Sequence, residues 1–210
     1  MPKSTWTPRQ HQILDALEAL FLAEGFRHLT IADLVDRLRC SRRTLYSLAP
    51  SREELILVVI GRLLNRMGVE AFSQAAALAD PGEAVASYLN TGVTTLSRAQ
   101  PAFIEDLETY LPTRQLYDRH VEIGLRVMGT FISDGIAAGT FRELHPALVA
   151  EIISGAAERI LRPDALARTG VSWSQALAEL SELIRYGLLS PGPDTGTAMC
   201  DTEQQERRHP

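Results

Sequence analysis

The sequence predicts an all-α fold, with three short N-terminal helices followed by a larger helical bundle. Apolar residues recur at the three- and four-residue spacing of helices along most of the 210 residues, and strand-like alternation is nearly absent. Helix start signals, in which Ser or Thr precedes Pro, Asp, Glu or Gln at capping positions, occur repeatedly. A hydrophobic content of 45% is sufficient for a substantial core.

The first helix is expected to begin after Thr7 and to end at Gly25. Thr7 is suited to cap the free backbone amides, and Gln10 to complete a capping box. Pro8 falls in the first turn, where its missing amide costs nothing. The inward stripe is Ile13, Leu14, Leu17, Leu20 and Phe21.

The second and third helices are expected to be short and to be separated by about one turn. The second begins at Thr30, with Asp33 three residues later, and the third begins at Ser41. Leu45 and Leu48 are the inward residues of the third helix. Two short helices joined by a tight turn are the requirement for a helix-turn-helix.

The larger bundle begins with a long helix that starts at Ser51 and extends to about Met67. Its start, Ser51-Arg52-Glu53-Glu54, is a second capping-box pattern. Later helices are expected from Asp80-Pro81, from Pro101 to a break at Pro112, from there to about Gly135, from Pro146, and from Ser172.

These patterns divide the chain into three parts. Residues 1–52 form the predicted helix-turn-helix domain, and residues 53–189 form the predicted effector-binding and dimerisation domain. Residues 190–210 contain almost no large apolar side chain, so we expect a disordered tail.

Positive charge is concentrated in the N-terminal third of an otherwise acidic chain. The whole chain has a formal net charge of −5, yet the stretch from Arg37 to Arg52 holds five arginines and no acid. Up to Arg66 there are ten basic and seven acidic residues, a net of +3, which leaves −8 for the rest. A basic patch against this trend indicates a nucleic-acid partner.

The cysteines and the hydropathy pattern exclude several other classes. Cys40 and Cys200 lie far apart without metal-ligand spacing, which favours a reducing, cytoplasmic environment. Apolar runs are too short for a membrane span, and a continuous apolar signal region is absent from the N-terminus. No cofactor and no metal site are expected.

The tip of the third helix is the candidate DNA-reading element. Ser41 is the expected cap, so Arg42, Arg43 and Thr44 are the first residues after it. Arginine can grip guanine or phosphate, and the hydroxyls of Thr44 and Tyr46 suit phosphate oxygens. Arg52 and the free amides after Ser51 offer a second anion site.

Three segments of the chain resemble the signature of the tetracycline-repressor (TetR) family over roughly residues 9 to 60. The resemblance implies a helix-turn-helix followed by a linking helix. It also implies phosphate contacts for Thr30, Tyr46 and Arg52, and base or backbone contacts for Arg42, Arg43 and Thr44. With Ser47, which faces outward, these seven residues are the predicted DNA-binding set. The matching segments are Thr30-Ile31-Ala32-Asp33-Leu34, Ser41-Arg42-Arg43-Thr44-Leu45-Tyr46 and Ser51-Arg52-Glu53-Glu54-Leu55.

The chain departs from that family pattern at three positions. Arg39 stands where the family usually has Gly, so a left-handed turn there would cost about 1 kcal/mol or more unless the turn is rebuilt. Ala49 stands where the family usually has an aromatic residue. This predicts a less tightly packed core in the helix-turn-helix domain, which we call the reading head. Arg52 stands where Lys is common and should preserve or strengthen phosphate binding.

The sequence also offers a candidate effector pocket and several weaker sites. The aromatic and Met residues of the central helices suit an apolar effector, although each one alone is more often a core residue. His120 with the neighbouring carboxylates of Glu105, Asp106, Glu108 and Glu122 lacks a recognised ligand motif, and Cys40 is interpreted as a small apolar turn residue. The pocket candidates are Phe72, Tyr88, Phe103, Tyr110, Tyr117, Met128 and Phe131.

The sequence therefore predicts a DNA-binding regulator rather than an enzyme. The expected form is a homodimeric repressor that a small apolar effector releases from a palindromic DNA operator. The resemblance implies that two helices, near residues 146–162 and 173–189, pair with those of a second copy. Two alternatives stay open: a related helical protein that has lost operator binding, and a helical-bundle enzyme or metal-binding protein. The effector, the operator, the regulated genes and the sign of regulation are not encoded in any recognisable pattern.

Overall fold

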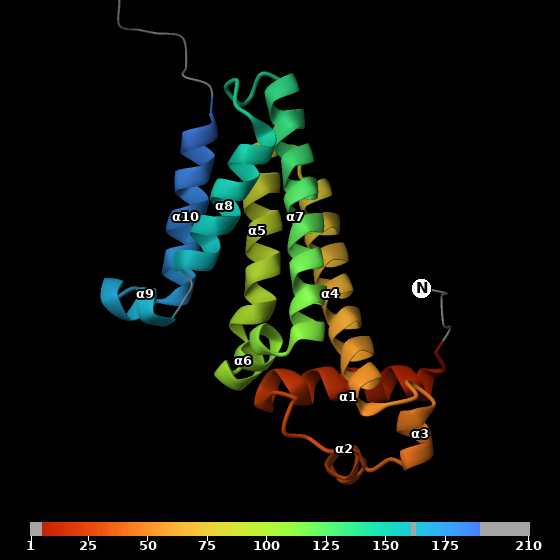
Figure 1. Cartoon of the computed structure of the whole chain (residues 1–210). Helices are drawn as coiled ribbons and strands as arrows, with labels where there is room; N and C mark the ends of the chain where they lie inside the picture. The colour runs from red at the N-terminus through yellow and green to blue at the C-terminus, as the bar shows by residue number, and fades with distance from the viewer. Residues whose placement is uncertain (1–5, 161–162, 190–210) are drawn as a thin grey trace, which may run out of the picture.

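The computed structural model describes residues 6–160 and 163–189, and within these ranges the chain is all-α, with ten helices and no strand. The three N-terminal helices lie at one end, α4 rises from them, and the remaining helices form a bundle beside α4 (Figure 1). This confirms the predicted fold class. The helices are α1 Pro8–Glu24, α2 Ile31–Leu38, α3 Arg42–Tyr46, α4 Arg52–Ala76, α5 Pro81–Ser97, α6 Pro101–Thr109, α7 Leu111–Ala137, α8 Pro146–Ile160, α9 Pro163–Thr169 and α10 Trp173–Leu188.

The N-terminal helices begin at the predicted caps. The Thr7 hydroxyl accepts a hydrogen bond from the Gln10 amide, and the Gln10 side chain accepts one from the Thr7 amide. Thr30 and Asp33 form the same reciprocal pair at the start of α2. Ser41 caps α3 through its hydroxyl. Each helix start is therefore set by local sequence.

One hydrophobic cluster joins the three short helices to α4 and α6. Leu17 and Phe21 of α1, Leu45 of α3 and Val59 of α4 are each almost completely buried in it. Phe103 of α6 lies in the same cluster, beside Phe26. The N-terminal helices are thus packed onto the foot of the bundle through both α4 and α6. The predicted domain boundary at residue 52 stays a prediction, and the predicted tail at 190–210 lies outside the described residues.

A second cluster fills the bundle between α5, α7, α8 and α10. Val85, Ile132 and Phe141 are completely or almost completely buried there. Phe141 sits against α7 so closely that a Cβ atom on Gly135 would lie 2.3 Å from its ring. Phe141 also forms an isolated β-bridge with Leu189, which ties the loop before α8 to the end of α10.

Two elements differ from the sequence-based expectation. The sequence does not indicate α9, because its seven residues are too few for a helical apolar period to stand out. The helix from Pro101 was expected to reach Leu111, but α6 ends at Thr109 and α7 begins at Leu111. Pro112 therefore lies in the first turn of a new helix, a position that tolerates its missing amide.

Arg39 ends α2 in the left-handed conformation, with φ 47° and ψ 48°, and is the one non-glycine residue with positive φ in the described chain. Its amide and that of Cys40 both bond the Val35 carbonyl. The turn therefore keeps the geometry usually given to glycine and is not rebuilt.

We expect Arg39→Gly to raise the free energy of unfolding by roughly 1 kcal/mol, since it removes the steric cost of a left-handed side chain. Urea denaturation of both proteins measures the change. Arg37→Gly, inside α2, is the matched control and should destabilise by a similar amount. A less stable Arg39→Gly protein would contradict the assigned turn geometry.

Candidate DNA interface and effector groove

The tip of α3 presents two arginines and a tyrosine to solvent. The capping hydroxyl of Ser41 fixes the start of the helix, and Leu45, which is buried, fixes its inner face. Arg42 and Arg43 are consequently exposed, and the Tyr46 side chain is 49% exposed. This is the arrangement in which the second helix of a helix-turn-helix presents its N-terminal residues to base edges.

Neither Arg42 nor Arg43 is paired with a carboxylate in the described part of the chain. The six ion pairs there involve Arg37, Arg52, Arg62, Arg66 and Arg114 instead. An unpaired guanidinium retains all its donors for phosphate or for guanine O6 and N7. The tip is thus free for an anionic partner.

The Ser and Thr hydroxyls in the predicted DNA-binding set already have partners within the protein. Thr44 and Ser41 share a hydrogen bond of 2.8 Å, and Ser47 donates to the Thr44 carbonyl. Ser47 also accepts from Gln10, which ties α3 to the start of α1. The Thr30 hydroxyl donates to Asp33. These side chains hold the reading head in shape, and their predicted DNA contacts stay predictions.

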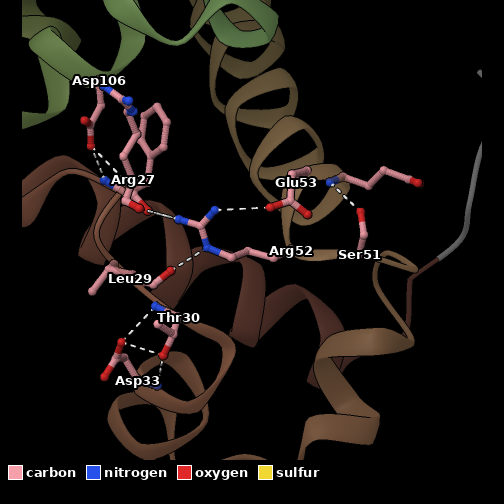
Figure 2. Close-up of polar contacts among 10 residues, drawn as sticks. Arg27, Leu29, Thr30, Asp33, Ser51, Arg52, Glu53 and Asp106 are labelled. Carbon is pink, nitrogen blue, oxygen red and sulfur yellow. Dashed lines mark hydrogen bonds and ion pairs between the residues drawn. The ribbon is translucent and has the colours of Figure 1, made fainter.

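Arg52 points into the protein, where it holds the loop between α1 and α2 (Figure 2). Its Nε donates to the Leu29 carbonyl at 2.6 Å, and its Nη2 donates to those of Phe26 and Arg27 at 3.0 and 2.6 Å. Nη1 lies 3.4 Å from the Glu53 carboxylate. With most of its donors used, the guanidinium is placed to position the loop rather than to meet phosphate directly.

Asp106 of α6 holds the same loop from the other side (Figure 2). Its Oδ2 accepts from the Phe26 amide at 2.6 Å and from the Arg27 amide at 2.9 Å. Gly25 makes this approach possible, because a Cβ atom there would lie 2.7 Å from that oxygen, and because its φ of 80° disfavours other residues. The loop is therefore fixed to α4 through its carbonyls and to α6 through its amides.

We expect Asp106→Ala to lower the free energy of unfolding by about 2–4 kcal/mol, because two charge-assisted hydrogen bonds are lost. Operator affinity should fall as well, since the loop sets the position of α2. Denaturation and DNA-binding titration measure the two effects. Glu105→Ala, on the same helix with an exposed side chain, is the control and should change neither. Equal behaviour of the two variants would contradict a role for Asp106.

A buried carboxylate joins α1 to α4. Glu18 is only 2% exposed and receives the guanidinium groups of Arg62 and Arg66, the second at 2.5 Å. Arg62 also reaches Asp15 at 2.7 Å. Ionised groups this close to the core are stable only when paired, so the network fixes the angle between α1 and α4.

The predicted effector residues do not form one site. Phe72, Tyr88 and Phe131 lie together, with the Phe131 ring 6.0 Å from Phe72 and 5.9 Å from Tyr88 between centroids. Met128 is buried in the bundle cluster against which Tyr88 and Phe131 pack.

The other three predicted effector residues pack beside the N-terminal helices. The rings of Phe103 and Tyr110 are 6.0 and 6.5 Å from Phe26, and Tyr117 packs against the N-terminal cluster. The helical spacing of these residues in the sequence does not reveal which of them pack against the N-terminal cluster and which pack inside the bundle.

A groove of about 320 Å³ opens between α4 and α7, with Tyr88 of α5 on its wall. Tyr88 is its single member from the predicted set. Its polar lining is Asn65, Tyr88, Arg119 and His120. Burial lowers the pKa of His120 and raises that of the Tyr88 phenol, so both are neutral near pH 7. A second hollow, of about 610 Å³, is lined by α4 alone among the described residues.

Other candidate chemistry has little support in the described residues. No group of three or more His, Cys, Asp or Glu side chains there is placed to hold a metal ion. Burial raises the pKa of the Cys40 thiol, which disfavours the reactive thiolate. None of the described helices is both long and apolar enough to cross a membrane.

Comparison with known families identifies the N-terminal region. Residues 13–59 match the model of the bacterial regulatory proteins of the tetR family. Residues 13–59 are therefore a TetR-family DNA-binding region. A helix-turn-helix region of this kind is typical of DNA-binding transcriptional regulators, a class whose members are transcription factors and not enzymes.

Solved structures of similar shape include other TetR-family regulators. PfmR from Thermus thermophilus is 26% identical, with a TM-score of 0.59, over 85% of this chain and all of that one. A putative regulator from Saccharomonospora viridis in complex with choline is 16% identical, with a TM-score of 0.71, covering 87% and 98%.

AibR in complex with isovaleryl coenzyme A and operator DNA is 14% identical, with a TM-score of 0.60, covering 83% and 97%. Both it and the choline complex, being under 25% identical, show a common fold. No curated protein matches this chain.

The sequence did not reveal the charged residues that hold the N-terminal helices against α4 and α6. Asp106 appeared only as one of several carboxylates near His120, and Glu18 lacked any signal beyond its place on the inward face of α1. That place, between the apolar residues Leu14, Leu17 and Phe21, is the one clue that an ion pair was needed there.

Proposed function

We propose that this protein is a cytoplasmic, homodimeric repressor whose two reading heads bind the half-sites of a near-palindromic operator and are released by a small-molecule effector. The observation that carries the proposal is the α3 tip, where Arg42 and Arg43 are exposed and unpaired on a capped helix. In the proposed complex these arginines read bases and Tyr46 contacts phosphate. Thr30, Thr44, Ser47 and Arg52 position the head, and any phosphate contact they make is secondary.

An exposed apolar face supports the dimer. Leu148 and Ile152 of α8 are 58% and 60% exposed, and Leu183 and Tyr186 of α10 are 73% and 70% exposed. A second copy would bury this face against itself in a four-helix bundle. Two heads are needed because successive major grooves on one face of DNA repeat at about 34–36 Å.

We expect the Ile152→Glu, Leu183→Glu variant to be monomeric, because two charges on each side of the interface cannot be desolvated. Sedimentation velocity measures the mass in solution. Leu111→Glu is the matched control, since Leu111 is 66% exposed on α7 outside this face, and it should remain dimeric. A wild-type monomer, or a double variant that stays dimeric, would rule out the proposed interface.

The contacts of α4 and α6 with the loop at residues 25–30 support a switching mechanism. An effector that binds better when the heads are wrongly spaced draws the protein into that state. Movement of α4 would be passed to the head through Arg52 and through Glu18, and movement of α6 through Asp106. Arg52 and Asp106 lie on the two helices that link the bundle to the head, and Glu18 lies on α1, where it meets Arg62 and Arg66 of α4.

Selection of genomic fragments by the purified protein tests the function. The proposal predicts enrichment of an inverted repeat, with half-site centres one helical turn or a multiple apart. Enrichment of no sequence above non-specific binding would overturn it, and would favour the alternative of a related protein that has lost its operator.

A further inference from the structure

Three of the residues that line the groove between α4 and α7 are glycines inside helices. Gly61 and Gly68 lie on α4, and Gly124 lies on α7. Glycine weakens a helix interior relative to alanine. A Cβ on Gly61 would meet nothing within 4 Å, and Cβ atoms on Gly68 and Gly124 would make ordinary contacts with His120 and Tyr88 at 3.5 and 3.4 Å. Packing between the helices therefore does not require glycine, and its effect is to leave space.

Four polar side chains line this space without partners of their own. Asn65, Tyr88, Arg119 and His120 form no hydrogen bond or ion pair within the described residues. Tyr88 and His120 are half-buried, so their hydroxyl and imidazole have limited access to water. Asn65 and Arg119 are exposed, so water can reach them. Polar groups that converge on an otherwise apolar hollow are the usual mark of a small-molecule site.

The charge of the groove defines the kind of ligand. Among the described residues, Arg119 is the single charged residue that lines it, and no carboxylate does. The remaining walls are aliphatic, from Leu64, Leu116, Val127 and the exposed Val69 and Ile123. A volume of about 320 Å³ is at the lower end of the range for ligand sites, roughly 300–1,000 Å³. A small molecule with one anionic end and an apolar body matches these features.

We propose that the groove between α4 and α7 binds a small monocarboxylic acid as the effector, with the carboxylate at Arg119 and the apolar body along the glycine-lined wall. This inference rests on the proposed function for its regulatory meaning. Neutral His120 and the Tyr88 hydroxyl each offer a hydrogen-bond donor to the carboxylate. Because Gly61 adjoins Arg62, a ligand here would press on the helix that carries both the Arg52 and the Glu18 contacts.

Calorimetric titration tests the ligand class directly. The probes are hexanoate, octanoate, benzoate and phenylacetate, each beside its neutral amide. We expect at least one acid to bind, and its amide to bind about 10–100-fold more weakly, since a charge-assisted hydrogen bond is lost. Binding of no acid, or equal binding of an acid and its amide, would overturn the proposal.

Matched variants locate the binding site. Gly61→Leu fills the groove, whereas Gly129→Leu adds the same side chain elsewhere on α7, at a position that also has no neighbour within 4 Å. Arg119→Gln removes the proposed anion contact, and Arg126→Gln removes an exposed arginine of α7 that does not line the groove. We expect acid binding to be lost in the first variant of each pair and kept in the second. Binding that survives Gly61→Leu and Arg119→Gln would place the ligand elsewhere and overturn the proposal.

Operator binding is measured separately on the same proteins. Arg119→Gln, which changes an exposed residue of α7, is expected to bind the selected operator and to be insensitive to the acid. Acid binding without any operator would overturn the proposed function and leave the ligand class standing. Selection of an operator without binding of any acid would overturn the proposed ligand class and leave the proposed function standing.

Discussion

Arg52→Met is expected to lower the free energy of unfolding by about 3–5 kcal/mol. The substitution keeps much of the side-chain volume but removes the guanidinium that bonds the carbonyls of Phe26, Arg27 and Leu29. Hydrogen bonds to a charged group contribute about 1.5–3 kcal/mol each, and water can replace part of the bond to exposed Arg27. Chemical denaturation of wild type and variant measures the loss.

Arg37→Met is the control for this change. Arg37 pairs with Glu24 on the surface, where its side chain is 42% exposed, so its loss should cost less than about 1 kcal/mol. If Arg52→Met also lost less than about 1 kcal/mol of stability, the positioning role would be contradicted. That result would return Arg52 to the phosphate contact that the sequence predicts.

Arg42→Ala and Arg43→Ala are each expected to weaken operator binding by about 1–3 kcal/mol per head, with little effect on stability. Both side chains are exposed and unpaired in the free protein, so truncation removes no described internal contact. A lost base contact also relaxes specificity at one operator position, whereas a lost phosphate contact weakens all sequences alike. Titration with operators mutated at single positions separates these cases.

Tyr46→Phe provides the phosphate-contact comparison. Tyr46 is exposed, and the loss of its hydroxyl should weaken binding to the operator and to an unrelated duplex by the same factor. Uniform losses for Arg42→Ala and Arg43→Ala as well would make those arginines phosphate contacts and leave base reading unexplained.

The sequence predicted most of the fold because most helix starts are set by residues that are close together in the chain. The caps at Thr7, Thr30, Ser41 and Ser172 bond partners only three residues away, so their patterns can be read directly. Arg39 was also identified from sequence as an unusual turn residue, and the structure shows that it adopts the left-handed geometry unchanged.

The candidate site was harder to predict because its contacts join distant parts of the chain. The Asp106 carboxylate accepts hydrogen bonds from amides about 80 residues earlier in the chain. A carboxylate that caps a loop from another helix follows no sequence period. The predicted phosphate role of Arg52 was based on its place after a helix start, which does not reveal that its side chain turns inward. The groove depends on the spacing of two helices, which the aromatic residues chosen from sequence did not indicate.

The ratio of affinities for operator and scrambled duplex tests the central claim, that the exposed arginines of α3 read DNA sequence. Wild type, the Arg42→Ala, Arg43→Ala variant and the Arg126→Ala control are titrated at several salt concentrations. The account predicts a ratio of about 10³ or more for wild type and control. It predicts a ratio at least about a hundredfold lower for the double variant. A ratio unchanged in the double variant would contradict the claim.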